Sequence, residues 1–373
     1  MAKPGRLQFI DFTRGIAMVI MAWDHVSGFW NQVHGGLEGI LKTRIPNLDL
    51  AHFMARFITH VCAPTFVFLA GTSIALMEKS RTARGVSQRD ISIHLVIRGI
   101  ILIALDFLWV APSFDLPQYA FGVIACIGAC FIIFSFARRL PPDVILILSV
   151  FTILNHEFLD LNFIPDTVAW GHYLRVILHE PGFTWMPYVG FYPVIPWIGV
   201  MGIGYWFGSL LNELPPEEYS KLKTPLVITG IASIVLFFVV RYFNWYGNLV
   251  HRWGNDIMDW LYLSKYPPSL AFLLWTLGWM CLILSLGVYL SDKGLNYNRL
   301  VSGIRLFGRN PLFFYLIHLW LYRFRLPGQM PPFYLTIPQT AVVWAVGLVV
   351  MWFITGRYEV FKRAHPDSLL RYI

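Results

Sequence analysis

Charged residues are scarce in this chain. Asp, Glu, Lys and Arg make up only 13% of its 373 residues, whereas soluble domains carry roughly 25%. Hydrophobic residues account for 57% and aromatic residues for 17%, and the mean hydropathy is +0.58. This composition excludes an ordinary water-soluble domain and indicates a polytopic membrane protein.

Cysteine is also rare, and several familiar motifs are missing. The four cysteines lie inside or at the ends of apolar segments: Cys62, Cys126, Cys130 and Cys281. We expect free thiols that pack within the membrane, and no metal site. The sequence has no phosphate-binding loop, no dinucleotide-binding glycine run and no nucleophile elbow. Any chemistry must therefore come from polar residues within the apolar segments.

Apolar runs of roughly 17–25 residues predict about ten transmembrane helices. Their extents are 7–29, 60–78, 91–110, 118–137, 143–159, 188–211, 224–243, 268–291, 306–324 and 337–356. We therefore predict an all-α polytopic membrane protein, with residues 1–373 forming a single bundle and a single domain. Arg6, Asp11 and Arg14 interrupt the apolar core that a signal peptide needs, so the first helix is expected to stay in the membrane.

The distribution of positive charge predicts the orientation. If the N-terminus is cytoplasmic, most of the 29 Lys and Arg residues fall on the cytoplasmic side, which favours an N-in, C-in topology. The net charge of +8 then reflects topology rather than nucleic-acid binding. Three longer connections, 30–59, 160–187 and 244–267, face outward. A bacterial inner membrane is the expected location, lipids are the expected neighbours, and a homodimer is left open.

Ionisable residues at membrane depth are costly, so they point to function. Asp11 and Arg14 lie three residues apart on one face of the first predicted helix and are able to pair. They form either an ion pair at the membrane boundary or a site where Arg14 meets an anionic ligand, since guanidinium groups suit phosphate oxygens.

Asp24 and His25 lie roughly 15 Å further along the same helix, in the outer half of the membrane. Histidine there is suited to general-base catalysis, and a carboxylate is suited to orienting it. Neighbours on a helix point about 100° apart, so Asp24 need not be the residue that touches His25. The alternative is a satisfied polar pair at the water boundary. His60 begins the second helix at a similar level and either faces the same pocket or simply starts the helix.

Further polar residues lie in later spans. Arg98 and Asp106 are eight residues apart in the third predicted helix and broadly share a face. Tyr315 and His318 are three apart in the ninth, a short distance after Arg309. Buried Tyr and His often only bond each other or a carbonyl, and this reading stays open for that pair.

These stretches together resemble the family of polytopic proteins grouped with the catalytic domain of heparan-alpha-glucosaminide N-acetyltransferase. The resemblance rests on Asp11-x-x-Arg14-Gly15, Met21-x-x-Asp24-His25, the 56–71 block, and Gly308-Arg-Asn-Pro-x-x-x-Tyr315-x-x-His318. It spans nearly the whole chain, and the 56–71 block is its most specific part. It implies a transmembrane acyltransferase. Acetyl-CoA or another acyl-CoA binds from the cytoplasm, and the acyl group passes to a small-molecule or saccharide acceptor on the far side.

Residue roles follow from this resemblance together with the positions in the spans. The expected catalytic residues are His25, Asp24 and His60, with His25 deprotonating an acceptor hydroxyl or amine for direct attack on the thioester. The expected acyl-CoA-binding residues are Arg14, Asp11, Arg98, Arg309, Tyr315 and His318. Two other functions stay open: a transporter, and a haem-binding electron carrier with His25 and His60 as ligands.

Overall fold

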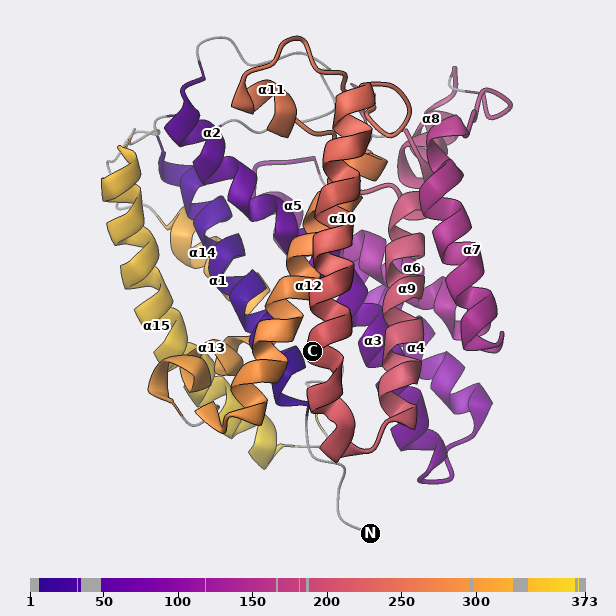
Figure 1. Ribbon diagram of the computed structural model, residues 1–373, viewed down its shortest axis with the longest axis vertical. Coiled ribbons are helices and arrows are strands. Elements are labelled where there is room, and N and C mark those ends of the chain that lie inside the picture. Colours follow the sequence, from indigo (N-terminus) through magenta and orange to yellow (C-terminus); the bar gives the residue numbers. More distant parts are fainter. Residues whose placement is uncertain are drawn as a thin grey trace.

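The computed structural model of the chain is a bundle of helices (Figure 1). It describes residues 7–31, 33–34, 48–117, 119–165, 167–180, 182–185, 188–295, 298–324, 335–365 and 368. The α-helices are α1 (Gln8–Trp30), α2 (Leu50–Phe57), α3 (Cys62–Thr82), α4 (Gln88–Leu105), α5 (Ala111–Ser113), α6 (Val123–Ala137), α7 (Pro142–Asn155), α8 (Ala169–Leu178), α9 (Val194–Glu213), α10 (Lys223–Phe243), α11 (Ile257–Leu261), α12 (Leu270–Asp292), α13 (Arg299–Arg309), α14 (Pro311–Arg323) and α15 (Ile337–Ala364).

Short elements complete the bundle. Three are 3₁₀ turns, η1 (Ile58–Val61), η3 (His156–Phe158) and η4 (Pro216–Leu222), and one is a π-helical turn, η2 (Asp106–Val110). A small sheet joins β1 (Tyr119–Phe121), β2 (Gly182–Trp185) and β3 (Tyr188–Gly190) in the order β1-β3-β2, with β1 parallel and β2 antiparallel to β3. The predicted helical fold is therefore confirmed, with this small sheet as an addition that the apolar runs did not indicate.

Six helical segments of the described chain are long and apolar enough to cross a membrane. They are Leu50–Thr82, Gln88–Ser113, Val194–Glu213, Pro216–Phe243, Leu270–Asp292 and Ile337–Ala364. The chain is therefore an integral membrane protein. Each of the other predicted spans also contains a helix, but α6, α7 and α14 are short and α1 is more polar. The count of about ten spans stays a prediction.

The two ends of the bundle differ (Figure 1). The start of α1 and the end of α15 lie at the lower end of the view, whereas α2, α8 and α11 lie at the upper end. We call these the inner and outer ends, following the predicted N-in, C-in topology. That topology requires the two chain ends to share a side, as α1 and α15 do; which side faces the cytoplasm stays a prediction.

Glycines let two helix pairs pack backbone against backbone. A Cβ on Gly204 of α9 would lie 1.9 Å from the carbonyl oxygen of Phe68 on α3, and one on Gly71 of α3 would lie 1.9 Å from that of Met201. Gly308 of α13 is as tightly placed, with its Cβ position 1.8 Å from the carbonyl oxygen of Asp11 on α1. Such close backbone contacts are typical of small residues at helix interfaces in membranes. The Gly308 contact also fixes the position of α1, which carries the principal site residues.

The predicted helix over 306–324 is in fact two helices. α13 ends at Arg309 and α14 begins at Pro311, with Asn310 between them in a non-helical conformation. Proline has no backbone N–H to donate and is favoured at the first position of a helix, so Pro311 starts a new helix. The break places α13 beside α1 at the inner end and directs α14 toward the outer half.

Candidate active site

A cavity of about 570 Å³ lies in the outer half of the bundle. Its walls include parts of α1, α2, η1, α3 and α14, the turn formed by η2 and α5, β1 and the start of α6, the segment after β3, and the segment before α12. The polar and aromatic side chains among its lining residues include Asp24, His25, Arg56, Thr59, Asp106, Tyr192, Lys265, Tyr266, Tyr315 and Arg323. Residues that are far apart in the sequence thus meet around one space.

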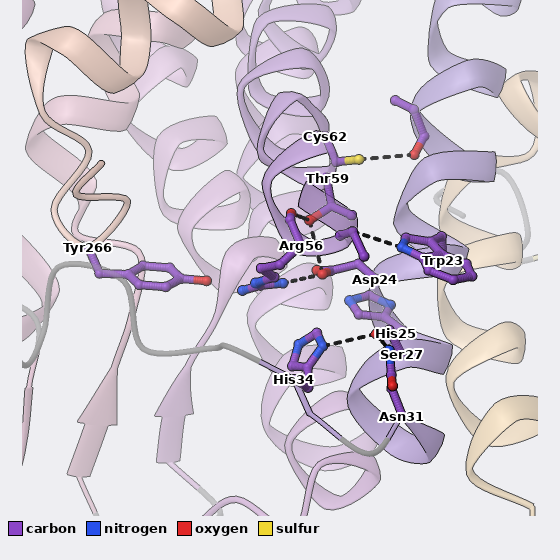
Figure 2. Close-up of polar contacts among 12 residues, drawn as sticks. Trp23, Asp24, His25, Ser27, Asn31, His34, Arg56, Thr59, Cys62 and Tyr266 are labelled. Carbon is purple, nitrogen blue, oxygen red and sulfur yellow. Dashed lines mark hydrogen bonds and ion pairs between the residues drawn. The ribbon is translucent and has the colours of Figure 1, made fainter. Parts of the chain in front are cut away.

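Asp24 forms an ion pair with Arg56, not with His25 (Figure 2). Its carboxylate also accepts a hydrogen bond from Thr59 Oγ1 at 3.0 Å. Both charged side chains are largely buried, with relative exposures of 13% for Asp24 and 9% for Arg56. The indole of Trp23 donates to the carbonyl of Ala55 at 2.8 Å, so a second bond ties α1 to α2 beside the ion pair. A buried, hydrogen-bonded ion pair of this kind fixes the geometry of the cavity wall.

His25 instead meets His318 of α14. His25 Nδ1 lies 2.7 Å from His318 Nε2, and His318 Nδ1 lies 2.8 Å from the carbonyl oxygen of Phe314. A carbonyl only accepts, so in the neutral pair His318 carries its hydrogen on Nδ1 and accepts at Nε2. His25 therefore carries its hydrogen on Nδ1, and its Nε2 is left unprotonated. That Nε2 makes no hydrogen bond to any residue within the described ranges.

Aromatic rings surround the two histidines. The His25 ring lies 5.4 Å from the Phe114 ring and 6.0 Å from the Tyr315 ring, measured between centroids. His318 is fully buried, and its ring stacks on that of Phe314. An apolar surround excludes water and strengthens the electrostatic effect of the groups inside it. The predicted proximity of Tyr315 and His318 is confirmed, with ring centroids 5.7 Å apart.

His60 lies elsewhere. It belongs to η1 and is 3% exposed, with its ring 5.3 Å from that of Phe57 and 5.5 Å from that of Phe272. Among the described residues, those that line the cavity do not include His60. The structure therefore does not bring the rings of His25 and His60 to one cavity wall, the arrangement on which both the shared-pocket and the haem hypotheses depended.

Asp106 begins the π-helical turn and reaches the start of α6. Its carboxylate accepts hydrogen bonds from the backbone N–H groups of Gly122 at 2.9 Å and Ala125 at 2.8 Å. A carboxylate at this position satisfies free N–H groups and complements the helix dipole. Arg98, predicted on the same face, instead lies over the ring of Phe131 at 5.4 Å.

At the inner end, Arg14 joins α1 to two other helices. Its guanidinium lies 3.7 Å from the carboxylate of Asp11, which confirms that these two residues pair. It also donates to the carbonyl of Gly308 at 3.1 Å and to Ser73 Oγ at 3.0 Å. Arg98 lies within electrostatic range of Arg14, so positive charge gathers beside α1.

Arg309 has a carboxylate partner of its own. Its guanidinium donates two hydrogen bonds to Glu359 of α15, at 2.9 and 2.8 Å. Glu359 also pairs with Arg363 at 2.7 Å. A bidentate pair of this type holds α13 against α15.

Arg56 and Lys265 are among the cavity residues for which the sequence predicted no role. Arg56 was part of a quoted motif, but its partner Asp24 lies 32 residues earlier, a separation that no local spacing rule covers. Lys265 was counted only as part of an outward connection. Its one sequence signal is the run Tyr262-Leu-Ser-Lys-Tyr-Pro-Pro268, in which a cation is flanked by tyrosines.

Comparison with known proteins agrees with these motifs. The family model for the catalytic domain of heparan-alpha-glucosaminide N-acetyltransferase matches residues 6–242. Among curated relatives, the mouse protein of that name is 24% identical over 220 residues, which cover 54% of this chain and 29% of the mouse protein. The human protein is 24% identical over 226 residues, which cover 57% of this chain and 30% of the human protein. The aligned region spans less than a third of either relative. The family match covers α1 to α10, including His25, Asp24 and Arg56, and the chain therefore belongs to the heparan-alpha-glucosaminide N-acetyltransferase catalytic family.

Proposed function

We propose that this protein is a transmembrane acyltransferase. It moves an acyl group, most simply acetyl, from acyl-CoA on the cytoplasmic side to a hydroxyl or amine acceptor in the outer cavity. The observation that carries the proposal is His25, whose Nδ1 is held by His318 while its Nε2 is open in a cavity of about 570 Å³. The activity for which the mouse and human relatives are named, an N-acetyltransferase acting on a glucosaminide, favours an amino sugar as the acceptor.

The reaction needs one base in contact with the acceptor. His25 Nε2 takes the proton from the acceptor N–H or O–H as the nitrogen or oxygen bonds to the thioester carbonyl carbon. The tetrahedral intermediate then collapses, its carbon–sulfur bond breaks, and the departing thiolate takes the proton from His25. The products are the acylated acceptor and free CoA. No acyl-histidine forms on this route.

His318 acts as a positioning residue for His25. It accepts the Nδ1 hydrogen of His25 at its Nε2, and it donates its own Nδ1 hydrogen to the carbonyl of Phe314. This arrangement fixes the tautomer and stabilises the imidazolium that forms during transfer. His318 was predicted to bind acyl-CoA, but its contact with His25 suits it better to orienting the base. Tyr315 lines the same cavity and lies close to the reacting groups.

The donor is proposed to enter from the inner end, where Arg14 and Arg98 gather positive charge. Guanidinium groups suit the phosphates of CoA, and Arg98 has no ion pair with a carboxylate in the described part of the chain. Arg14 and His25 are eleven residues apart on α1, about 16 Å along the helix axis. The long pantetheine arm of CoA is suited to bridging such a gap. Arg309 is a weaker candidate because Glu359 holds its guanidinium by two hydrogen bonds of 2.9 and 2.8 Å, whereas the carboxylate of Asp11 lies 3.7 Å from the guanidinium of Arg14.

Thiol release tests the proposal directly. Purified protein in detergent is given acetyl-CoA and a panel of amino sugars, and free CoA is followed with a thiol reagent. We expect acceptor-dependent release that falls by about 10²–10⁴-fold in His25→Gln. His60→Gln is the matched control, since it alters a buried histidine outside the cavity wall, and it should keep most of the activity. Equal activity in wild type and His25→Gln would overturn the assignment.

A further inference from the structure

Lys265 reaches the cavity on a buried segment that is not helical. Between α11 and α12 the chain runs inward, and the residues from Leu261 to Tyr266 are each less than 9% exposed. Lys265 itself is 4% exposed and lines the cavity. A lysine in an outward loop normally places its ammonium in water. Here the ammonium is held inside.

The ammonium of Lys265 has no acidic partner of its own. In the described ranges it makes no hydrogen bond and no ion pair. Its neighbours are two aromatic rings, with centroids 5.2 Å away for Tyr266 and 5.9 Å away for Tyr192. The carboxylate of Asp24 is within electrostatic range, but Arg56 and Thr59 already bind it. Cation–π contacts offset only part of the cost of burying a charge.

The surrounding loop is built to keep Lys265 in place. Arg241, at the end of α10, is fully buried and donates to the carbonyls of Asp259 at 2.5 Å, Trp260 at 2.9 Å and Tyr262 at 3.2 Å. These bonds fix the backbone of the residues that precede Lys265. A cation that is held in place, has no counterion and faces a cavity is preorganised to bind an anion.

The phenol groups add hydrogen-bonding capacity beside this charge. The hydroxyls of Tyr192 and Tyr266 lie 3.5 Å apart. Figure 2 shows the Tyr266 side chain on the other side of the Arg56 guanidinium from Asp24, with its hydroxyl directed toward Arg56. A ligand oxygen bound by Lys265 would therefore meet phenol hydroxyls as well as the ammonium.

We propose that Lys265, with Tyr192 and Tyr266, binds an anionic oxygen group of the acceptor, either a carboxylate or a phosphate. This inference rests on the proposed acyl transfer, because only that function makes the bound molecule an acceptor. The phosphates of CoA are not suited to this site if the donor enters beside Arg14, because the pantetheine arm separates them from the thioester at His25. The cavity thus selects acceptors that carry a negative charge near the attacking amine or hydroxyl.

Binding of three matched sugars tests the proposal. Glucose, glucuronate and glucose 6-phosphate differ only at carbon 6, and their dissociation constants are measured by titration calorimetry on the purified full chain. We expect at least one charged sugar to bind about tenfold more tightly than glucose, as one charge-assisted contact allows. The two charged sugars distinguish a carboxylate site from a phosphate site.

Three variants make the test specific. Lys265→Met should bring the charged sugars to within about twofold of glucose, and Lys265→Arg should keep part of the preference. Lys223→Met is the control, because Lys223 pairs with Asp292 on the exposed surface and should leave the preference unchanged. Equal binding of all three sugars by wild type, no saturable binding of either charged sugar, or a preference that survives in a folded Lys265→Met protein would each overturn the proposal.

This result is independent of catalysis. If wild type prefers the charged sugars but releases no thiol from acetyl-CoA with any acceptor, acyl transfer is wrong and the anion site stands. If thiol release depends on His25 but no charge preference is found, the anion site is wrong and acyl transfer stands.

Discussion

The polar groups near the two ends of α1 are held in different ways. At the inner end, Arg14 contacts Asp11, Ser73 and Gly308, so its guanidinium ties helices together and is fixed in position before the proposed phosphate ligand binds. Near the outer end, His25 Nε2 and, from the segment before α12, the ammonium of Lys265 face a cavity and make no hydrogen bond within the described chain. The inner guanidinium therefore stabilises the bundle as well as forming part of a proposed binding site, whereas the outer groups are left open for a ligand.

Breaking the ion pair at the cavity wall should have the largest effect. Arg56→Met leaves the carboxylate of Asp24 buried without its cation, and we expect it to lower the free energy of unfolding by about 3–5 kcal/mol. Denaturation in detergent, followed by tryptophan fluorescence, measures the loss. The double variant Asp24→Asn with Arg56→Met should recover much of the stability, and an additive loss would show that the two residues do not act as a pair.

Removing the partner of His25 tests whether His318 positions the base or binds the donor. His318→Ala takes away the group that fixes the His25 tautomer, so we expect kcat to fall about a hundredfold. The KM for acetyl-CoA should stay within about twofold, because His318 does not contact the donor in this account. A rise in KM with unchanged kcat would instead return His318 to acyl-CoA binding, as first predicted.

Changing the inner end should affect binding rather than chemistry. Arg14→Lys keeps the charge but loses the planar fork, so we expect about tenfold weaker binding of acetyl-CoA at unchanged kcat. Arg84→Lys is the matched control, since the Arg84 side chain is exposed at the same end and its guanidinium donates to the carbonyl of Ser80. Equal affinities for wild type and both variants would show that phosphate binding lies elsewhere.

The smallest effect concerns a second histidine pair, His156 and His179, between η3 and the end of α8. His156 Nδ1 lies 3.1 Å from His179 Nε2, and both side chains are buried. His179 lies in the outward connection 160–187, and burial lowers its pKa.

The lowered pKa of His179 makes stability depend on pH. Above about pH 6.5 this histidine is neutral in the folded and the unfolded chain, and its contribution is fully present. Below about pH 6.5 the unfolded chain binds a proton that the folded chain does not, so the free energy of unfolding falls by up to about 1.4 kcal/mol per pH unit. The melting temperature between pH 7.5 and 5 should therefore decline less in His179→Gln than in wild type. Identical slopes would contradict this assignment.

The helices were predictable because the length of an apolar run is a local property. The Asp11 and Arg14 pair was predictable for the same reason, since residues three apart share a helix face. The partners of His25 and Asp24 were not. His318 lies 293 residues from His25 and Arg56 lies 32 residues from Asp24, and only helix packing brings them together.

The inward position of Lys265 could not be predicted for a different reason. The segment from Leu261 to Tyr266 has neither helical nor strand periodicity, so no pattern indicates which way its side chains face. Its hydrophilic lysine favours an outward loop, yet the bonds from Arg241 hold the segment inside. The break at Asn310 was missed because the apolar run continues through it, although Pro311 was the available signal.

The most direct test of the account is the sidedness of transfer. Proteoliposomes of uniform orientation receive labelled acetyl-CoA only at the side of Arg14 and an amino-sugar acceptor only at the side of Lys265. The account predicts labelled product in the acceptor compartment, absent in His25→Gln and retained in His60→Gln. Product that forms only when donor and acceptor share one compartment, or equal product with His25→Gln, would contradict it.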